Sequence, residues 1–305
     1  MENVATMGVT SDKRRMEPVL VASLAAVYLI WSSTYLAMRV AVAELPPLLM
    51  ASVRFLAAGT VMFALARRAG AKWPGWRRAL RIAGPGIPLF VGGNGLVAIA
   101  ETSVSSGGAA VVCATMPLWV GVFSAFLGER PSAREWLALA LGFAGVLVLI
   151  GSPSLDSDPL HVGVLLASPP LWALGSMWAR RAPKPSDGAA TRGDALLTPA
   201  LQMLLGGVTL IAGGLVTGET FPASASTSAW LCVAYLGVFG SIIGFTAYAW
   251  LLRNARPVVA TSYAFVNPVL AVLIGAALYG EPLAWTTAVA NALIVAAVVL
   301  ALRKR

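Results

Sequence analysis

Residues 31–39 read WSSTYLAMR and residues 172–180 read WALGSMWAR, so a tryptophan stands eight residues before an arginine in both stretches. Both stretches lie in long apolar runs, and each run is the first of a set of five. The spacing predicts that the two halves of the chain are related. An odd number of membrane spans per half would give the second half the opposite orientation, which makes an inverted repeat.

A second correspondence lies farther along each half. Pro117 stands eleven residues before Gly128-Glu129, and Pro268 stands twelve residues before Gly280-Glu281. With five spans per half, the first Gly-Glu pair faces the cytoplasm and the second faces outside. Inverted repeats are typical of carriers that work by alternating access, with a substrate site near the membrane midplane between the halves.

The composition requires a lipid environment. The chain of 305 residues is 58% hydrophobic and 11% charged, and its mean hydropathy is +0.79. One soluble domain cannot bury that much apolar surface. A hydrocarbon core roughly 30 Å thick needs about 20 helical residues, and backbone groups in lipid must pair internally. The sequence therefore predicts an all-α membrane protein with ten transmembrane helices, near residues 18–43, 47–66, 80–100, 105–127, 134–151, 160–180, 195–217, 228–251, 257–279 and 284–302.

The basic residues predict the direction of these spans. All but two of the 22 Lys and Arg residues lie on alternate loops and on the two tails, and the exceptions are Arg39 and Arg54. Because cytoplasmic loops accumulate Lys and Arg, both termini of this multi-pass inner or plasma membrane protein are predicted to be cytoplasmic. The expected segments are a cytoplasmic tail at 1–17, a first five-helix repeat at 18–151, an extracytoplasmic linker at 152–159, a second five-helix repeat at 160–302 and a basic tail at 303–305.

Several other kinds of partner and site are not expected. The net charge of +9 would suit nucleic acid, but the basic residues border the span ends, where the anionic inner leaflet accounts for them. Cys113 and Cys232 both fall within spans and are expected to be apolar fillers, so no metal site is predicted. The chain has no phosphate-binding G-x-x-x-x-G-K-[ST] loop, so neither ATP nor another cofactor is expected to drive it directly.

Together and in this order, several short segments carry a family resemblance: 31–39, Pro46-Pro47 with Arg54-Phe55, 91–95 with Ala100-Glu101, Pro117 to Arg130, 240–244 and 260–268. They resemble the EamA family of the drug/metabolite transporter superfamily over essentially the whole chain, and closer still the YedA-type exporters. The resemblance implies a ten-helix carrier that exports amino acids, other small metabolites or drugs. Small multidrug antiporters of the superfamily use a glutamate in their first helix for proton coupling. Here the first span has no acid between Glu17 and Glu44, so that route is not expected.

Arg54 is the deepest predicted charge. It lies seven residues past Pro47, about 10 Å into the membrane at about 1.5 Å per residue. A guanidinium there needs a planar acceptor, and two kinds are open: a structural brace to Glu101 or to backbone carbonyls, or a carboxylate or phosphate of a substrate. Arg39 lies near the outer end of its helix, where it can snorkel or pair with an acid.

The remaining candidates are polar or aromatic groups within spans, which are costly there unless they serve packing or function. Pro117 and Pro268 remove backbone donors and are predicted gates or hinges, and Pro169-Pro170 is predicted to break the sixth span. Trp31 and Trp172 are expected to face each other across the repeat axis and to form an amphipathic pocket. The full set of predicted substrate contacts is Trp31, Ser33, Tyr35, Arg54, Asn94, Trp172, Tyr248, Tyr263 and Asn267.

These features favour a secondary carrier that exports small molecules. Glu101 is the one acid near enough to the expected cavity to exchange a proton, and a facilitated route without proton coupling is equally open. An intramembrane enzyme would need a buried histidine, paired aspartates or a metal cluster, whereas the single histidine, His161, is predicted at the outer mouth of a span. A receptor or channel is the other alternative, and a channel would need a continuous polar stripe. The sequence leaves open the substrate and the oligomeric state.

Overall fold

The chain is helical, as the sequence predicts. The computed structural model describes residues 2–104, 109, 112–150, 158–186, 191–270 and 285–303, and no strand occurs among them. From Glu2 onward the predicted tail is continuous with the first span, because one helix runs from Glu2 through Pro18 to Val42. In chain order the elements are α1 (Glu2–Val42), α2 (Pro47–Arg68), α3 (Trp76–Ala83), η1 (Ile87–Gly95), α4 (Leu96–Ala100), α6 (Met116–Phe126), α7 (Ala133–Ile150), α8 (Pro159–Arg181), α9 (Asp194–Val216), α10 (Thr227–Tyr235), η2 (Leu236–Ile243), α11 (Gly244–Asn254), α12 (Pro257–Ala260) and α14 (Trp285–Leu302).

Six helical segments in the described ranges are long and apolar enough to cross a membrane: Glu17–Val42, Pro47–Arg68, Trp76–Ala100, Pro159–Arg181, Asp194–Val216 and Thr227–Asn254. They match the predicted first, second, third, sixth, seventh and eighth spans. Shorter apolar helices occupy Met116–Phe126, Pro257–Leu270 and Ala288–Leu302. Most of the predicted linker at 152–159, the Gly280-Glu281 pair and the last two residues of the basic tail lie outside the described residues.

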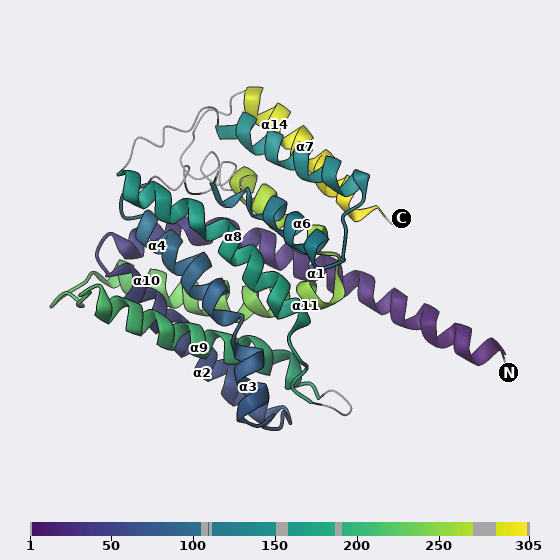
Figure 1. The fold of residues 1–305 in the computed structure, drawn as a ribbon, viewed down its shortest axis with the longest axis horizontal. Helices are drawn as coiled ribbons and strands as arrows, with labels where there is room; N and C mark the ends of the chain where they lie inside the picture. The colour runs from purple at the N-terminus through teal and green to yellow at the C-terminus, as the bar shows by residue number, and fades with distance from the viewer. Residues whose placement is uncertain are drawn as a thin grey trace.

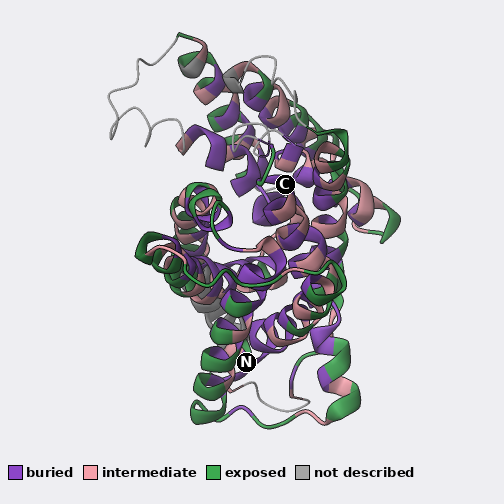
Figure 2. Cartoon of the chain, turned by 90° about the vertical axis from the view of Figure 1, so that its left-hand side faces the viewer, coloured by how far each residue is buried: buried purple, intermediate pink, exposed green. Residues whose placement is uncertain are grey.

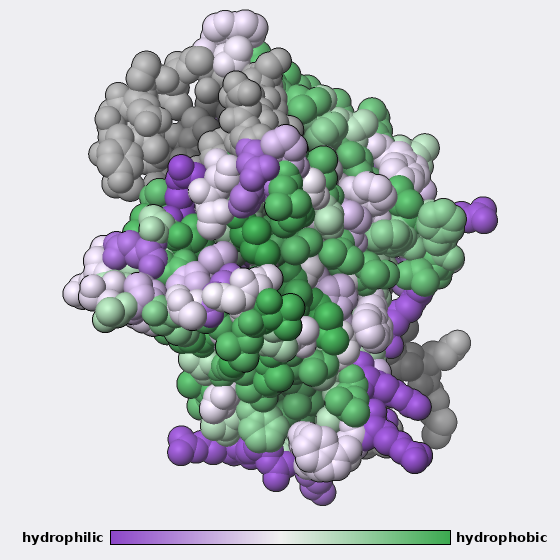
Figure 3. Space-filling model, turned by 60° about the vertical axis from the view of Figure 1, so that its left-hand side comes forward, coloured by the Kyte–Doolittle hydropathy of each residue, from purple (hydrophilic) through white to green (hydrophobic). Residues whose placement is uncertain are grey.

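The outer faces of the helices are apolar. Large hydrophobic side chains such as Leu29, Phe126, Val216 and Leu231 are exposed. Figure 2 shows buried residues on the inward faces of the helices and exposed residues on the outward faces. In Figure 3 apolar side chains cover the middle of the visible surface, and hydrophilic ones gather along its lower edge. A continuous apolar surface of this size suits a lipid environment.

Helices that are far apart in the sequence pair with each other. α2 packs along α9, α1 packs on α10, η2 and α11, and α8 packs on η1 and α4. α7 packs along α14, and the two lie side by side in Figure 1. Glycines permit close approach: Gly207 of α9 faces Leu56 of α2, and Gly145 of α7 faces Ile294 of α14. Small residues at helix contacts are the usual way in which membrane helices pack closely.

Two of the long helices contain a wide π-helical stretch near the middle. η1 interrupts the helix Trp76–Ala100, and η2 interrupts the helix Thr227–Asn254. A wide turn leaves backbone carbonyls for other partners. The carbonyl oxygen of Gly93 accepts a hydrogen bond from Ser168 Oγ at 2.9 Å, and that of Gly240 accepts one from Trp31 Nε1 at 3.0 Å. Neither stretch was predicted from the sequence.

The predicted helix breaks are partly wrong. α8 continues through Pro169 and Pro170, and the helix around Pro268 is continuous from Tyr263 to Leu270. The described breaks lie instead at 114–115, just before α6 and Pro117, and at 261–262. The hydroxyl of Thr115 donates to the Val112 carbonyl at 2.7 Å, and the hydroxyl of Thr261 donates to the Pro257 carbonyl at 2.9 Å. The backbone N–H groups of Thr115 and Thr261 donate to the same two carbonyls, so each hydroxyl adds a second hydrogen bond at its break. The first break comes directly before Pro117 in the first turn of α6, where a proline is expected to interrupt a helix.

Candidate functional site

Five aromatic side chains meet at the centre of the molecule. The centre of the Trp31 ring in α1 lies 5.7 Å from that of Trp172 in α8 in an edge-to-face arrangement, so the two tryptophans that the predicted repeat pairs are in contact. The centre of the Trp31 ring also lies 5.3 Å from the ring centre of Phe245, 5.1 Å from that of Tyr248 and 4.7 Å from that of Tyr263. Edge-to-face and tilted ring pairs at these distances contribute stabilising free energy in addition to that from the apolar area that they bury. This group of five rings is called the aromatic layer below.

Hydrogen bonds fix the polar edges of the aromatic layer. Trp31 Nε1 donates to the Gly240 carbonyl that η2 leaves available. Trp172 Nε1 donates to the Tyr248 hydroxyl at 3.2 Å, and that hydroxyl shares a second hydrogen bond of 2.7 Å with Ser176 Oγ. The rings are therefore held in position as well as packed.

Each tryptophan lies against a glycine of the opposite half. A Cβ atom added at Gly244 in α11 would overlap Trp31 Nε1, and one added at Gly93 in η1 would overlap the Trp172 ring. Small residues four apart, such as Gly240 and Gly244, usually allow close packing of helices. The structure gives that packing a specific partner, since these glycines accept an indole and an arginine rather than a helix backbone alone.

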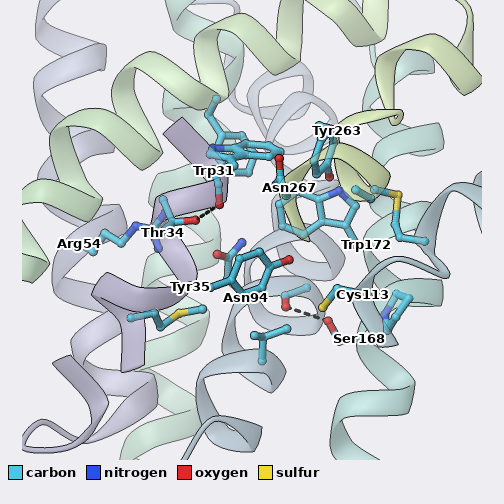
Figure 4. A pocket seen from close by; sticks show the side chains of 17 residues that line it. Trp31, Thr34, Tyr35, Arg54, Asn94, Cys113, Ser168, Trp172, Tyr263 and Asn267 are labelled. Carbon is cyan, nitrogen blue, oxygen red and sulfur yellow. Dashed lines mark hydrogen bonds between the residues drawn. The ribbon is translucent and has the colours of Figure 1, made fainter. Parts of the chain in front are cut away.

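A cavity of about 630 Å³, its open mouth included, adjoins the aromatic layer (Figure 4). Seven of the nine predicted substrate contacts line it: Trp31, Tyr35, Arg54, Asn94, Trp172, Tyr263 and Asn267. In Figure 4 Arg54 lies at one side of the cavity beside Thr34, and Trp172 and Ser168 lie on the other side. The remaining lining residues are Thr34, Met38, Gly93, Val97, Cys113, Met116, Ser168, Pro169, Phe245 and Ala264.

Two predicted contacts lie outside this cavity. Ser33 Oγ bonds to the Ile30 carbonyl at 2.8 Å and to the Tyr235 hydroxyl at 2.6 Å, so it joins α1 to α10. Tyr248 is fully buried behind the two tryptophans, where it takes part in the aromatic layer. Pro117 and Pro268 do not line the cavity either, although their neighbours Met116 and Asn267 do.

The arginine in the cavity does not pair with Glu101. Arg54 is 5% exposed, and its Nε donates to Ser241 Oγ at 2.8 Å. Ser241 Oγ in turn donates to the Leu236 carbonyl at 3.1 Å, five residues back along η2. The guanidinium carbon lies 4.6 Å from the centre of the Phe55 ring, a cation–π distance. The brace to Glu101 that the sequence allowed is therefore absent, and a serine hydroxyl takes its place.

Glu101 is buried at the end of α4 without a hydrogen-bond partner for either carboxylate oxygen among the described residues. It interacts electrostatically with Arg39, Tyr35 and Cys113, of which the last two line the cavity. Arg39 itself donates to the Val104 carbonyl at 3.1 Å. Glu101 follows the last residue of its apolar span, and its burial raises the pKa of the carboxyl to about 8 while Arg39 acts in the lowering direction.

Two asparagine side chains in the cavity wall retain unused hydrogen-bonding groups. Asn94 Nδ2 and Asn267 Oδ1 are buried and have no partner among the described residues. A buried amide without a partner is costly, so such groups are often completed by a ligand or by water. One of them offers a donor and the other an acceptor, both at the wall of the cavity.

Sequence reasoning missed Ser241, Ser168 and Met116. Ser241 reaches Arg54 only because η2 widens the helix, and Ser168 reaches the Gly93 carbonyl only because η1 does the same. The glycines of the two wide turns, Gly93 and Gly240 among them, were the available signal.

A charged cluster joins the end of α8 to two loops at the end of the molecule near Arg303. Arg180 Nε lies 3.1 Å from Glu129 Oε2, and Arg180 Nη1 donates to the Ala255 carbonyl at 2.7 Å and to that of Leu252. Arg256 and Glu135 form a second ion pair. This cluster connects the end of α8 to the segment before α7 and to the turn between α11 and α12. A separate open cavity, lined by Glu129, Arg180 and Arg256 among others, surrounds it.

Comparisons with known proteins agree with the fold and confirm the resemblance found in the sequence. The EamA-like transporter family matches residues 18–151 and again residues 162–303. The uncharacterized inner membrane transporter YedA of Escherichia coli (strain K12) is 42% identical over 92% of this chain and 90% of its own. The uncharacterized transporter YvbV of Bacillus subtilis (strain 168) is 30% identical over 91% of this chain and 89% of its own. A solved protein structure with 22% identity has the same fold, with a TM-score of 0.73 over 93% of this chain and 96% of the other. The chain therefore belongs to the EamA-like transporter family.

Proposed function

We propose that this protein is a secondary transporter that exports small molecules across the inner membrane by alternating access. The observation that carries the proposal is the cavity beside the aromatic layer. Its walls come from both stretches that match the family, with Trp31, Arg54 and Asn94 from the first and Trp172 and Tyr263 from the second. A site shared between two halves can be exposed to one side and then to the other when the halves move.

Ten spans in two inverted five-helix halves are the membrane arrangement that we propose, with both termini in the cytoplasm. The repeated family match and the alternation of basic loops support it. The reciprocal contacts at the centre add further support, since Trp31 of one half packs on Gly244 of the other and Trp172 packs on Gly93. The wide turns η1 and η2 occupy similar positions in the third and eighth spans.

In this arrangement the cavity opens outward. On α1 the lining residues start at Trp31 and continue toward the outer end as far as Met38. On the helix Trp76–Ala100 they extend from Gly93 to Val97, again toward the outer end, and on α8 they lie near the middle, from Ser168 to Trp172. The aromatic layer bounds the inner side of the cavity, and the charged cluster around Glu129 and Arg180 joins the loops beside the second, open cavity at the cytoplasmic end.

Transport fits this geometry better than the alternatives. The aromatic layer interrupts any continuous polar path, which favours a carrier over a channel. The cavity contains a cation, two amides and several aromatic rings but no arrangement of a nucleophile and a base among its described residues, which disfavours an enzyme. An amphipathic metabolite, such as an amino acid or a drug-like compound, is the substrate class that we propose on these grounds.

The test is a metabolite profile of cytoplasm and medium from cells that overproduce the protein. We expect at least one small molecule to accumulate in the medium and to be depleted in the cytoplasm relative to cells with an empty vector. The variant Gly93→Leu provides a loss-of-function control, since a leucine side chain at Gly93 would occupy the space of the Trp172 ring. This variant should not export the molecule. A profile identical to that of the empty vector, at verified membrane levels of the protein, would contradict export.

A further inference from the structure

The charge of the cavity is unbalanced. Arg54 is its one cationic side chain among the described lining residues, and no carboxylate is present among them. Glu101 is buried nearby but does not line the cavity, and no hydrogen bond links its oxygens to Arg54. A guanidinium stays protonated in proteins, so this positive charge persists in the cavity wall. An unpaired charge in a low-dielectric environment is costly, and an anion that enters the cavity would remove that cost.

The guanidinium is held so that its outer edge remains available. Ser241 engages Nε, and the Phe55 ring packs against the guanidinium group. Nη1 and Nη2 make no hydrogen bond to the described residues. Nη2 lies beside Gly240, where an added Cβ would come within 2.9 Å of it, so the missing side chain makes room for the arginine. Two free Nη groups in one plane form the fork that binds a carboxylate with two parallel hydrogen bonds.

We propose that the cavity selects monoanionic carboxylates with an aromatic or other broad apolar body, and that Arg54 binds the carboxylate. This inference rests on the proposed function, because it treats the cavity as the substrate site. One fixed positive charge balances one negative charge, so a dianion such as a phosphate monoester would leave an excess negative charge. A ligand whose charge is only positive would face Arg54 without a counterion among the described lining residues.

The other walls suit the rest of such a molecule. Trp31, Trp172 and Tyr263 present ring surfaces to an apolar body. Asn94 Nδ2 offers a donor that can supplement Arg54, and Asn267 Oδ1 offers an acceptor for a hydroxyl or amide hydrogen of the ligand. A ligand with one anionic end and one hydrogen-bond donor would engage Arg54, Asn94 Nδ2 and Asn267 Oδ1 together.

The experiment measures binding rather than turnover. The purified full-length protein in lipid nanodiscs is titrated calorimetrically with 3-phenylpropionate, its neutral amide 3-phenylpropionamide, and the cation phenethylamine. We expect the carboxylate to bind at least about tenfold more tightly than the amide, and the amine to bind most weakly, since charge-assisted bidentate pairs are the strong ones. In Arg54→Gln the preference for acid over amide should disappear, and in Arg54→Lys it should shrink, because lysine keeps the charge but lacks the fork.

Arg253→Gln is the matched control. Arg253 is also partly buried within a span, and its Nη2 donates to Thr198 Oγ1 at 3.1 Å, away from this cavity. This variant should keep the preference for the acid.

The ligand series in the wild type tests the proposal even if Arg54→Gln does not fold. Equal or tighter binding of the amide or the amine, or no heat of binding for the acid, would overturn it. Export of a cationic or neutral metabolite would then leave the transport function intact, whereas a metabolite profile like that of the empty vector would count against the transport function itself.

Discussion

Gly244 and Gly237 illustrate how a single methyl group is expected to act at the centre of the protein. A Cβ at Gly244 would overlap Trp31 Nε1, whereas a Cβ at Gly237 would meet nothing within 4 Å. We expect Gly244→Ala to displace Trp31, to weaken its hydrogen bond to Gly240 and to destabilise the protein by about 1–3 kcal/mol, as overpacking does. Gly237→Ala should be neutral or slightly stabilising. Thermal unfolding of both variants in detergent, followed by tryptophan fluorescence, checks this, and equal melting temperatures would count against the packing described here.

The carboxyl of Glu101 is expected to respond to pH. Its pKa is raised by burial to about 8, so it is neutral at pH 7 and loses its proton as the pH rises through about 8. If it exchanges a proton during transport, flux in proteoliposomes should change between about pH 7 and pH 9 in the wild type. Glu101→Gln should be flat over the same range.

Glu44→Gln provides the control for that measurement. Glu44 is exposed, and hydrogen bonds from Ser226 lower the pKa of its carboxyl, so it remains ionised between pH 7 and pH 9. Its replacement should therefore leave the pH profile of the wild type in place. An unchanged profile in Glu101→Gln as well would remove Glu101 from proton coupling and favour facilitated transport.

Among the elements, long apolar helices are predictable and the local widening of a helix is not. A run of about 20 apolar residues has few alternatives in lipid, so α2, α8 and α9 begin and end near the predicted positions. The contact between Trp31 and Trp172 also follows from the repeated spacing. The Arg54–Ser241 bond does not, because it depends on η2 and therefore on packing between distant helices. The prolines in α8 mislead for a similar reason, since the surrounding helices support the backbone there.

The charged cluster links α8 to two loops, and its removal is expected to loosen the end of the molecule that we propose faces the cytoplasm. Arg180→Gln would lose the pairing with Glu129 and the hydrogen bonds to the Ala255 and Leu252 carbonyls. Both side chains are partly exposed, so a modest effect is expected, about 0.4–1 kcal/mol or a shift of roughly two- to fivefold toward an inward-open state. Double electron–electron resonance between spin labels at the cytoplasmic ends of α8 and α11 would measure that shift. Arg68→Gln, at an exposed position at the end of α2, is the control, and the same distance distribution in both variants would exclude a gating role for the cluster.

The whole molecule carries its own probe of cavity access in its two cysteines. Cys113 lines the cavity and Cys232 does not, so a Cys232→Ser variant has one thiol, at the cavity wall. Because the cavity opens outward in the arrangement proposed above, a membrane-impermeant methanethiosulfonate added to intact spheroplasts should label Cys113. Inside-out vesicles should be labelled more slowly, since the proposed orientation puts the aromatic layer and the charged cluster between Cys113 and the cytoplasm. 3-Phenylpropionate should protect the thiol from the reagent, because both occupy the same cavity. Faster labelling from the cytoplasmic side would reverse the proposed orientation, and labelling at the same rate from both sides would indicate an open channel instead of a carrier.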